Sequence, residues 1–236
     1  MADPGPDPFD RRDRFVAYVA HELRTPIALQ RALAEAALAD PHADKVALRA
    51  MGEGIVASCE RQQRLIEALL DLTRSQRGLT RQEPVDIAAI TSQALQAHEL
   101  SELDSVVALE PAVATGDSTL LERVAANLVS NAIRHNVPHG RIEVATRTEA
   151  RRALLSVANT GPLIPAGELT RLFQPFERLG SQPRACADGI GLGLAIVHSI
   201  ADAHNATVAA HARAGGGLEI EVRFPGEREH ARRTKR

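Results

Sequence analysis

The sequence predicts two parts: a long helical hairpin that forms a four-helix bundle with a second copy, and then a two-layer α/β sandwich. The hairpin is predicted because apolar residues recur at steps of three and four, the period of an α-helix, up to about residue 77. The sandwich is predicted because short helical and strand-like segments are mixed from about residue 85 onward. Two alternating segments near the end flank Gly215–Gly217, a pattern typical of a β-hairpin.

The composition is that of a soluble globular protein. The 236 residues are 44% hydrophobic and 25% charged, and the net charge of −2 implies no bulk attraction to nucleic acid or anionic membranes. Aromatic residues make up only 3%, which argues against a stacking surface for single-stranded nucleic acid. Cys59 and Cys186 form no metal-ligand spacing. No apolar run has the length of a membrane span, and the first residues do not form a signal peptide.

The hairpin is expected over residues 10–77, after a disordered, proline-rich leader at 1–9. Its helices should cover residues 10–39 and 44–75, joined by a short break. Their apolar stripes are too long and narrow for two helices to bury alone, so we expect a second copy to complete a four-helix bundle. The alternative is a hairpin packed on the C-terminal domain of the same chain. The stripe of the first helix consists of Phe15, Val19, Leu23, Pro26, Leu33 and Ala37.

A linker at 78–84 leads to the second domain, expected over 85–226, and a charged tail follows at 227–236. The predicted helices of this domain cover residues 86–100, 117–136, 166–172 and 193–204. The predicted strands cover residues 106–109, 141–148, 153–158, 206–212 and 218–224.

A histidine on the first helix is a candidate catalytic residue. On a helical wheel His21 lies opposite the apolar stripe and should face solvent, with Glu22 beside it and Thr25 one turn further along the same face. A surface histidine needs no function. However, Pro26 interrupts a strong helix one turn later, at a cost of roughly 3 kcal/mol, and this cost suggests a functional segment.

The helix at 117–136 carries a candidate metal site. Asn127, Asn131 and His135 are spaced four residues apart and share one face. Asparagine is a poor helix former, so two on one face are unexpected there unless they bind something. Their amide oxygens suit Mg²⁺, which keeps substrate phosphates in its shell, while Arg134 and His135 could donate to phosphate. Two surface asparagines by chance remain the alternative.

Two glycine-containing segments complete the candidate site. Asn159 and Gly161 follow a strand, where a side-chain carbonyl could contact the edge of a base and glycine allows close approach. Gly189, Gly191 and Gly193 precede a helix, so backbone N–H groups could bind a polyphosphate. The dinucleotide fingerprint fails because Leu194 takes the place of its third glycine, and a Walker-type loop lacks its Lys-Ser or Lys-Thr pair.

In this order, the segments resemble those of bacterial two-component sensor histidine kinases, from about Phe15 to Pro225. The C-terminal part resembles the ATP-binding fold that these kinases share with certain chaperones, mismatch-repair proteins and topoisomerases. The resemblance implies that His21 accepts the phosphoryl group, that Asn131 binds Mg²⁺ within a motif shared with Asn127, and that Arg178 lies near the terminal phosphate of ATP. It also implies two glycine boxes, whose residues here are Asn159, Gly161, Gly189, Gly191, Leu192, Gly193 and Leu194.

This chain departs from the family pattern at two positions. The first glycine box normally begins with aspartate, which accepts from the adenine amino group, but Asn159 stands here. The amide oxygen can still accept, although a flipped amide would present a donor instead. Leu163 replaces a second glycine and could narrow the site. Where related ATPases carry a water-activating glutamate, this chain has Asn127, which favours transfer to a side chain over bulk hydrolysis of ATP.

The expected function is autophosphorylation of His21 from Mg-ATP, with Glu22 accepting the Nδ1 proton, and then transfer to an aspartate of a response regulator. Thr25 resembles the residue that positions water when such proteins dephosphorylate their regulator. The alternatives are a regulator phosphatase and a non-catalytic dimeric scaffold that binds nucleotide weakly. We expect a cytoplasmic homodimer without direct contact to nucleic acid. Any membrane attachment would come from a missing upstream segment or a separate sensor.

Overall fold

The structure, a computed structural model, describes residues 8–40, 42–76, 79, 81–177 and 191–225. Most of the expected leader and the expected tail at 227–236 lie outside these residues. The chain divides into two compact units, residues 1–69 and residues 70–236.

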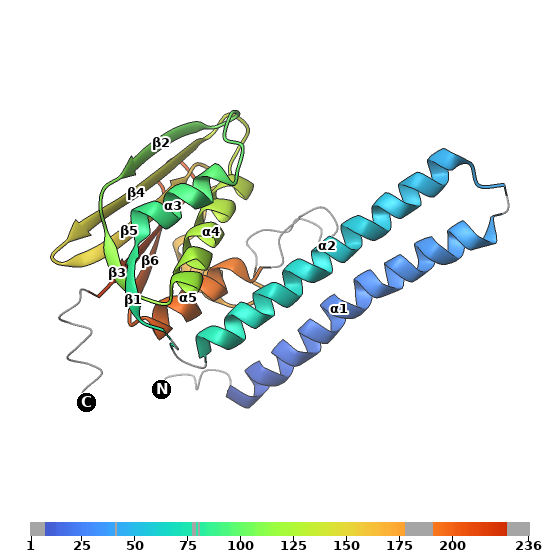
Figure 1. The fold of residues 1–236 in the computed structure, drawn as a ribbon, viewed down its shortest axis with the longest axis horizontal. Coiled ribbons are helices and arrows are strands. Elements are labelled where there is room, and N and C mark those ends of the chain that lie inside the picture. The colour runs from blue at the N-terminus through green and yellow to red at the C-terminus, as the bar shows by residue number, and fades with distance from the viewer. Residues whose placement is uncertain (1–7, 41, 77–78, 80, 178–190, 226–236) are drawn as a thin grey trace. The chain divides into compact units, whose positions relative to one another are not determined.

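Two long antiparallel helices form the first unit (Figure 1). Helix α1 (Pro8–Ala39) begins two residues before its expected start, and helix α2 covers Lys45–Gln76. The connection between them is held by aspartates: Asp40 accepts from the backbone N–H of His42 at 2.9 Å, and Asp44 accepts from that of Ala47 at 2.7 Å. Asp44 thus caps α2 in the manner expected of an acidic residue before a helix.

Both helices leave apolar side chains uncovered within one chain. The predicted stripe of α1 is half-buried along its whole length, as the helical period requires. Large apolar residues nevertheless remain exposed on both helices: Val16, Ile27, Leu29, Leu38, Val46, Leu48, Val56, Ile66 and Leu70. A hairpin of one chain therefore does not bury its own apolar surface.

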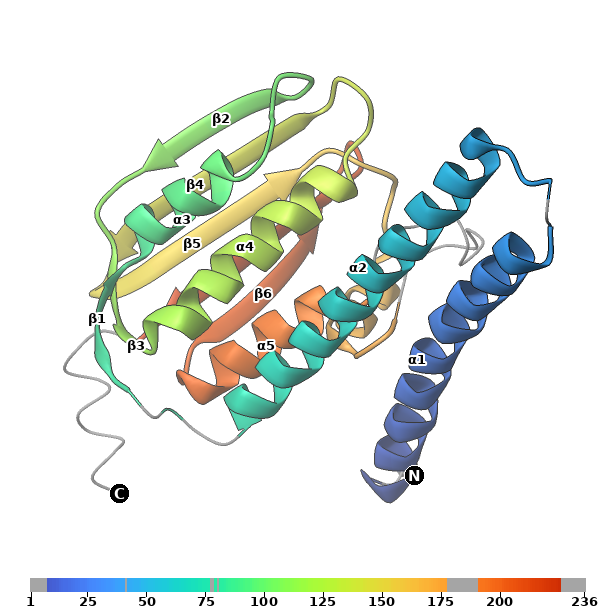
Figure 2. The same cartoon turned by 45° about the vertical axis from the view of Figure 1, so that its right-hand side comes forward.

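A five-stranded mixed sheet with helices on one face forms the second unit (Figure 2). In sheet order the strands are β2 (Asp104–Leu109), β4 (Arg141–Glu149), β5 (Arg152–Asn159), β7 (Leu218–Phe224) and β6 (Thr207–Ala212). Strand β2 is parallel to β4, and the other neighbours are antiparallel. The covering helices are α3 (Ile87–Gln96), α4 (Ser118–Arg134) and α5 (Gly193–Ala203). This arrangement confirms the predicted two-layer sandwich.

The structure also contains a small second sheet that the sequence pattern did not reveal. Strands β1 (Glu83–Asp86) and β3 (Val113–Gly116) pair in antiparallel register. Residues 83 and 84 were expected in the linker, because Gln82, Glu83 and Pro84 are typical of a linker. A proline is compatible with such a short edge strand, since an outward-facing edge needs no N–H donor there. Segment η1 (Ala166–Phe173), predicted as a short helix, is a 3₁₀-helix.

The start of α4 is anchored to the end of α5 by a buried histidine. Asp117 caps α4 by accepting from the N–H of Leu120 at 3.3 Å, and its own N–H donates to Nε2 of His204 at 3.1 Å. Nδ1 of His204 lies 2.7 Å from the carbonyl oxygen of Ile200. Since Nε2 accepts, Nδ1 carries the proton, and the fully buried ring is the neutral tautomer.

The last two turns of α2, from Leu70, belong to the second unit. There Asp71 forms an ion pair with Arg123 of α4, with 3.2 Å between Oδ2 and Nε. Ser75 Oγ donates to the carbonyl oxygen of Leu72 at 2.9 Å, so the 2.6 Å contact with Ser199 of α5 uses the Ser199 proton. Asp71, Leu72 and Ser75 are all buried. Two polar contacts therefore attach the end of α2 to the helical layer.

Candidate functional site

The imidazole of His21 is exposed on α1, as predicted. Glu22 is half-buried, and Thr25 is exposed with its hydroxyl donating to the His21 carbonyl oxygen at 3.1 Å. Pro26 has no N–H to offer to the carbonyl of Glu22, so the helix loses one backbone bond beside the histidine. The result is a solvent-facing imidazole on a locally weakened helix.

A polar layer lies within the hairpin next to this proline, and sequence reasoning missed it. The amide nitrogen of Gln30 donates to Gln62 Oε1 at 2.8 Å and approaches Ser58 Oγ at 3.3 Å. Gln62 in turn donates to the carbonyl oxygen of Leu23 at 3.3 Å, and Ser58 lies 3.4 Å from that of Pro26. The available signal was Gln62, a polar residue that lies three residues after Cys59 and three before Leu65, where the helical period places apolar residues.

The two asparagines of α4 lie on its half-buried side, while Leu120, Val124 and Leu128 are buried, as expected. Asn127 donates from Nδ2 to the carbonyl oxygen of Arg123 at 2.9 Å, which leaves its Oδ1 facing the start of α5. A Cβ atom added at Gly193 would lie 3.2 Å from that oxygen. The structure thus brings the asparagine-bearing helix against the N-terminus of α5, where backbone N–H groups are available to an anion.

The other predicted residues of α4 lie at its C-terminal end. His135 is the C-cap residue, and both Arg134 and His135 are exposed. The carbonyl oxygen of His135 receives a bond from Nδ2 of Asn159 at 3.3 Å. This bond joins the end of α4 to the end of β5.

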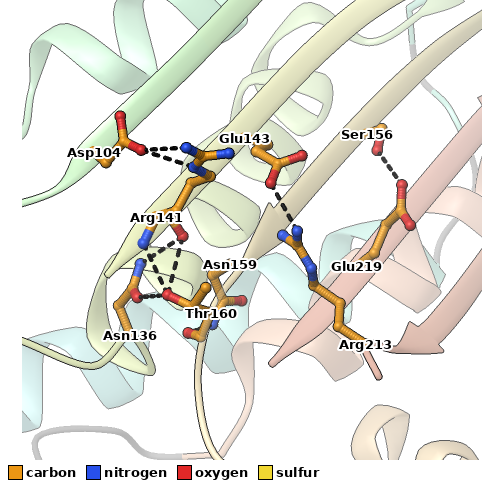
Figure 3. Close-up of polar contacts among 9 residues, drawn as sticks. All are labelled: Asp104, Asn136, Arg141, Glu143, Ser156, Asn159, Thr160, Arg213 and Glu219. Atoms are coloured by element: carbon orange, nitrogen blue, oxygen red, sulfur yellow. Dashed lines mark hydrogen bonds and ion pairs between the residues drawn. The ribbon is translucent and has the colours of Figure 1, made fainter. Parts of the chain in front are cut away.

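The amide of Asn159, drawn beside Thr160 in Figure 3, donates to backbone carbonyl oxygens. Its Nδ2 also donates to the carbonyl oxygen of Thr160 at 2.7 Å, and the residue is only 4% exposed. The neighbouring hydroxyl of Thr160 donates to Asn136 Oδ1 at 2.6 Å and accepts from the N–H of Arg141 at 2.8 Å. Thr160 and Asn136 were not predicted as site residues. Asparagine just after a helix was the available signal, since it favours such local bonds.

Close backbone packing surrounds this turn. A Cβ atom at Gly161 would lie 2.8 Å from the His135 carbonyl oxygen and 3.4 Å from Asn159 Nδ2. Gly217, with φ of 101°, packs so closely that a Cβ atom would overlap the Asn159 carbonyl oxygen. Gly217 was predicted only as part of a β-hairpin, but it also supports the turn. Leu163 is 75% exposed, so its side chain points to solvent.

The second glycine segment is described from Gly191 onward; Arg178 and Gly189 lie outside the described residues. Gly191 has φ of 74°, and its carbonyl oxygen accepts from the N–H of Phe176 at 2.8 Å. Leu192 and Leu194 are buried, so they can offer a ligand their backbone but not their side chains. Gly193 begins α5.

Carboxylates neutralise Arg171 of η1. Its guanidinium lies 3.0 Å from Glu168 and 2.8 Å from Glu177. The charge of Glu168, followed by the hydrogen bond to Glu177, raises the pKa of Arg171 above its ordinary value. A phosphate would have to compete with both carboxylates for this arginine.

Within the described residues, no group of three histidine, cysteine, aspartate or glutamate side chains could hold a metal ion. No described helix is both long enough and apolar enough to cross a lipid bilayer.

Comparison with known proteins identifies both units. Residues 11–78 match the family model of the His Kinase A (phospho-acceptor) domain, and residues 116–228 match that of the histidine kinase-, DNA gyrase B- and HSP90-like ATPases. The solved mycobacterial sensor histidine kinase MprB is 30% identical, with a TM-score of 0.54, over 61% of this chain and 97% of that one. The chain belongs to the sensor histidine kinases. This result confirms the resemblance on which the sequence interpretation rested.

Two further relatives extend the comparison across the kinase core. Sensor protein CutS of Streptomyces coelicolor is 44% identical over 222 residues, which are 92% of this chain and 53% of that protein. This histidine kinase sequence therefore spans about half the length of the curated relatives it matches. The solved histidine kinase ThkA, in complex with response regulator protein TrrA, is 21% identical with a TM-score of 0.63, over 93% of this chain and 65% of that one. At that identity the likeness concerns the fold.

Proposed function

We propose that this chain transfers the γ-phosphoryl group of Mg-ATP to Nε2 of His21. The observation that carries the proposal is the meeting of the Asn127 face of α4 with the N-terminus of α5, in a domain that matches ATPases. Phosphoryl transfer needs mainly positioning and neutralisation of charge. The exposed His21 of a phospho-acceptor domain provides the nucleophile.

The donor set around Asn131 fits Mg²⁺ that arrives with the nucleotide. Asn131 offers a neutral, hard oxygen on a half-buried helix face. Among the described residues no group of three histidine, cysteine, aspartate or glutamate side chains could hold the ion, so nucleotide phosphates and water would supply its other oxygen ligands. Bound Mg²⁺ would neutralise the charge of the phosphates.

The residues beside His21 support proton handling. Glu22 follows the histidine and could accept the Nδ1 proton, which orients the ring and raises its nucleophilicity. Thr25 donates its proton to the His21 carbonyl, yet its oxygen can still accept a hydrogen bond from water. This leaves Thr25 suited to the reverse reaction, the dephosphorylation of a regulator.

The phosphohistidine would donate its phosphoryl group to an aspartate of a response regulator that docks on the helical hairpin. ThkA, which shares this fold, was solved with such a regulator. Two hairpins would form the bundle, since the exposed apolar residues of α1 and α2 require a covering surface.

The test is incubation of the chain with Mg²⁺ and ATP labelled at the γ-phosphate. Acid-labile, alkali-stable label is expected on the wild type and on His42→Gln, which removes another exposed histidine. Label should be absent from His21→Gln and strongly reduced in Asn131→Ala. Uptake of label by His21→Gln would contradict the assignment of the acceptor.

The second candidate is a regulator phosphatase or a non-catalytic scaffold. The replacement of aspartate by Asn159 is the observation that favours weak nucleotide binding. A wild-type chain that binds ATP but takes up no label would support this candidate, and a phosphorylated regulator would be the next substrate to test.

A further inference from the structure

The proline of α1 marks the place where the backbone of this helix is least well held. Pro26 has no N–H to donate to the carbonyl oxygen of Glu22, and long helices bend at such positions. His21 lies on the N-terminal side of the proline, so a bend there moves the imidazole relative to the second half of α1. Helix α2 contains no proline between Lys45 and Gln76 and therefore has no such break.

One side chain of α2 bonds to both sides of this break. Nε2 of Gln62 donates at 3.3 Å to the carbonyl oxygen of Leu23, which precedes the proline. Oε1 of Gln62 accepts at 2.8 Å from Nε2 of Gln30, which follows the proline. Both glutamines are half-buried, so water compensates only in part for the loss of these bonds. A bend that moves the two halves of α1 apart must lengthen at least one of them.

The buried hydroxyl of Ser58 completes this arrangement. The second N–H of the Gln30 amide can donate to Ser58 Oγ at 3.3 Å, and Ser58 donates at 3.4 Å to the carbonyl oxygen of Pro26. Both chains of bonds that start at the Gln30 nitrogen thus end at backbone carbonyls of α1. Because a carbonyl oxygen only accepts, the Leu23 carbonyl fixes which end of the Gln62 amide carries the nitrogen.

We propose that Gln62 is a positioning residue for His21. Its bonds to Leu23 and Gln30 keep the His21 segment of α1 aligned with the segment after the proline, so that the imidazole stays where it can accept the phosphoryl group. This inference rests on the proposed transfer to His21. A displacement of about 1 Å can slow such a transfer by about a hundredfold, even when its cause lies outside the reacting groups.

Positioning and stability can be separated because they respond differently when both amides are removed. Gln62→Met breaks both bonds across the proline, and Gln30→Met breaks the one on the far side. Each single variant leaves an amide or a carbonyl without its partner, which lowers stability. The double variant removes both amides and should regain much of the stability. It does not restore a connection across the break, so the His21 segment stays unaligned.

The experiment measures uptake of label from Mg-ATP at increasing ATP concentration, with the full chain of the wild type, both single variants and the double variant. The maximal rate should fall about tenfold in each single variant and stay about tenfold lower in the double variant. The ATP concentration that gives half the maximal rate should change less than about twofold, since no residue of the nucleotide site is altered. Gln63→Met makes the same change at the next, exposed position of α2 and should keep the wild-type rate.

Amide hydrogen exchange over residues 22–31 provides a readout that needs no activity. Exchange there should be faster than in the wild type in both single variants and in the double variant, although urea unfolding shows that the double variant has regained stability. Wild-type exchange in Gln62→Met would overturn the inference.

A wild-type rate in the double variant would mean that Gln62 acts only through stability, and it would overturn the inference while leaving transfer to His21 intact. An unchanged rate in Gln62→Met would do the same. Absence of label on the wild type would overturn the proposed function together with this inference. If a single variant does not fold, the rate of the double variant decides alone.

Discussion

At the scale of single residues, the candidate nucleotide site requires glycine at a position where a side chain would not fit. The turn after β5 brings a backbone carbonyl, an amide and glycines within contact distance of one another. Gly161 has no room for a side chain, because its missing Cβ would press on the carbonyl that also receives the Asn159 bond. Glycine there is required by packing.

We expect Gly161→Ala to destabilise the chain by about 1–3 kcal/mol, since the added methyl group forces the turn away from α4. Nucleotide affinity should fall with it. The control is Gly167→Ala six residues later, where nothing lies within 4 Å of the added Cβ. Urea unfolding and nucleotide titration measure both effects, and equal stability of the two variants would contradict the packing argument.

The sequence was sufficient to place most of these residues but not to orient them. Spacing placed Asn127 and Asn131 on one face of a helix, and the structure has them there. The orientation of the Asn159 amide depends on the carbonyl of His135, 24 residues away. No local pattern encodes a contact of that range, which is why the question of a flipped amide stayed open at the level of sequence.

At the scale of elements, polar contacts determine how helices meet. The layer of Gln30, Ser58 and Gln62 pairs α1 with α2 beside the proline, and Asp71 pairs the end of α2 with α4. Each contact uses a polar group that is wholly or partly removed from water, so water compensates only in part for the loss of the contact.

Replacing Gln62 by methionine should destabilise the hairpin by about 1–2 kcal/mol, because Gln30 loses its closest acceptor and the Leu23 carbonyl loses a donor. The double change Gln30→Met and Gln62→Met should recover much of that loss, since an amide that has lost its partner destabilises the hairpin more than an apolar side chain at the same position does. Denaturation at a fixed protein concentration provides the double-mutant cycle. Additive losses from the two single variants would argue against a shared polar layer.

Asp71→Asn should destabilise the second unit by about 1–2 kcal/mol, through loss of the charge-assisted bond to Arg123. Glu122→Gln removes the same charge from an exposed neighbour of Arg123 on α4 and should change stability little. Thermal unfolding at low salt compares the two variants. A similar small effect of both would mean that the ion pair is not a significant attachment.

Long helices and central strands were predictable because their periodicity extends over many residues. Strands β1 and β3 were not, because each has only four residues and one contains Pro84. Their pairing depends on a partner about 30 residues away, which alternation within four residues cannot indicate.

At the scale of the whole molecule, the apolar surface left open on α1 and α2 predicts the assembly. Ile66 is 47% exposed in one chain, and Leu70, one turn later on the same face of α2, is 51% exposed. Leu163 of the second unit is 75% exposed, but it projects from a turn. Exposure alone would rank Leu163 as the stronger candidate for an interface, whereas the shared apolar face of the helix favours Ile66.

We therefore expect Ile66→Glu to shift the chain from dimer to monomer, because it places a charge in an interface between helices. Leu163→Glu should leave the mass of the assembly unchanged. Sedimentation equilibrium measures both masses. Dissociation by Leu163→Glu, or a dimer that persists with Ile66→Glu, would contradict the bundle arrangement.

The contact between Ser75 and Ser199 has a consequence for the order of events during synthesis. Its two residues lie 124 positions apart in the chain. At typical translation rates, about 6–25 s pass between the addition of the first residue and the addition of the second. The rest of the hairpin precedes Ser75 in the chain, so it is synthesised well before Ser199 is added. The end of α2, however, must wait for α5 to leave the ribosome, and until then the buried side chains of Asp71, Leu72 and Ser75 remain open to chaperones and proteases.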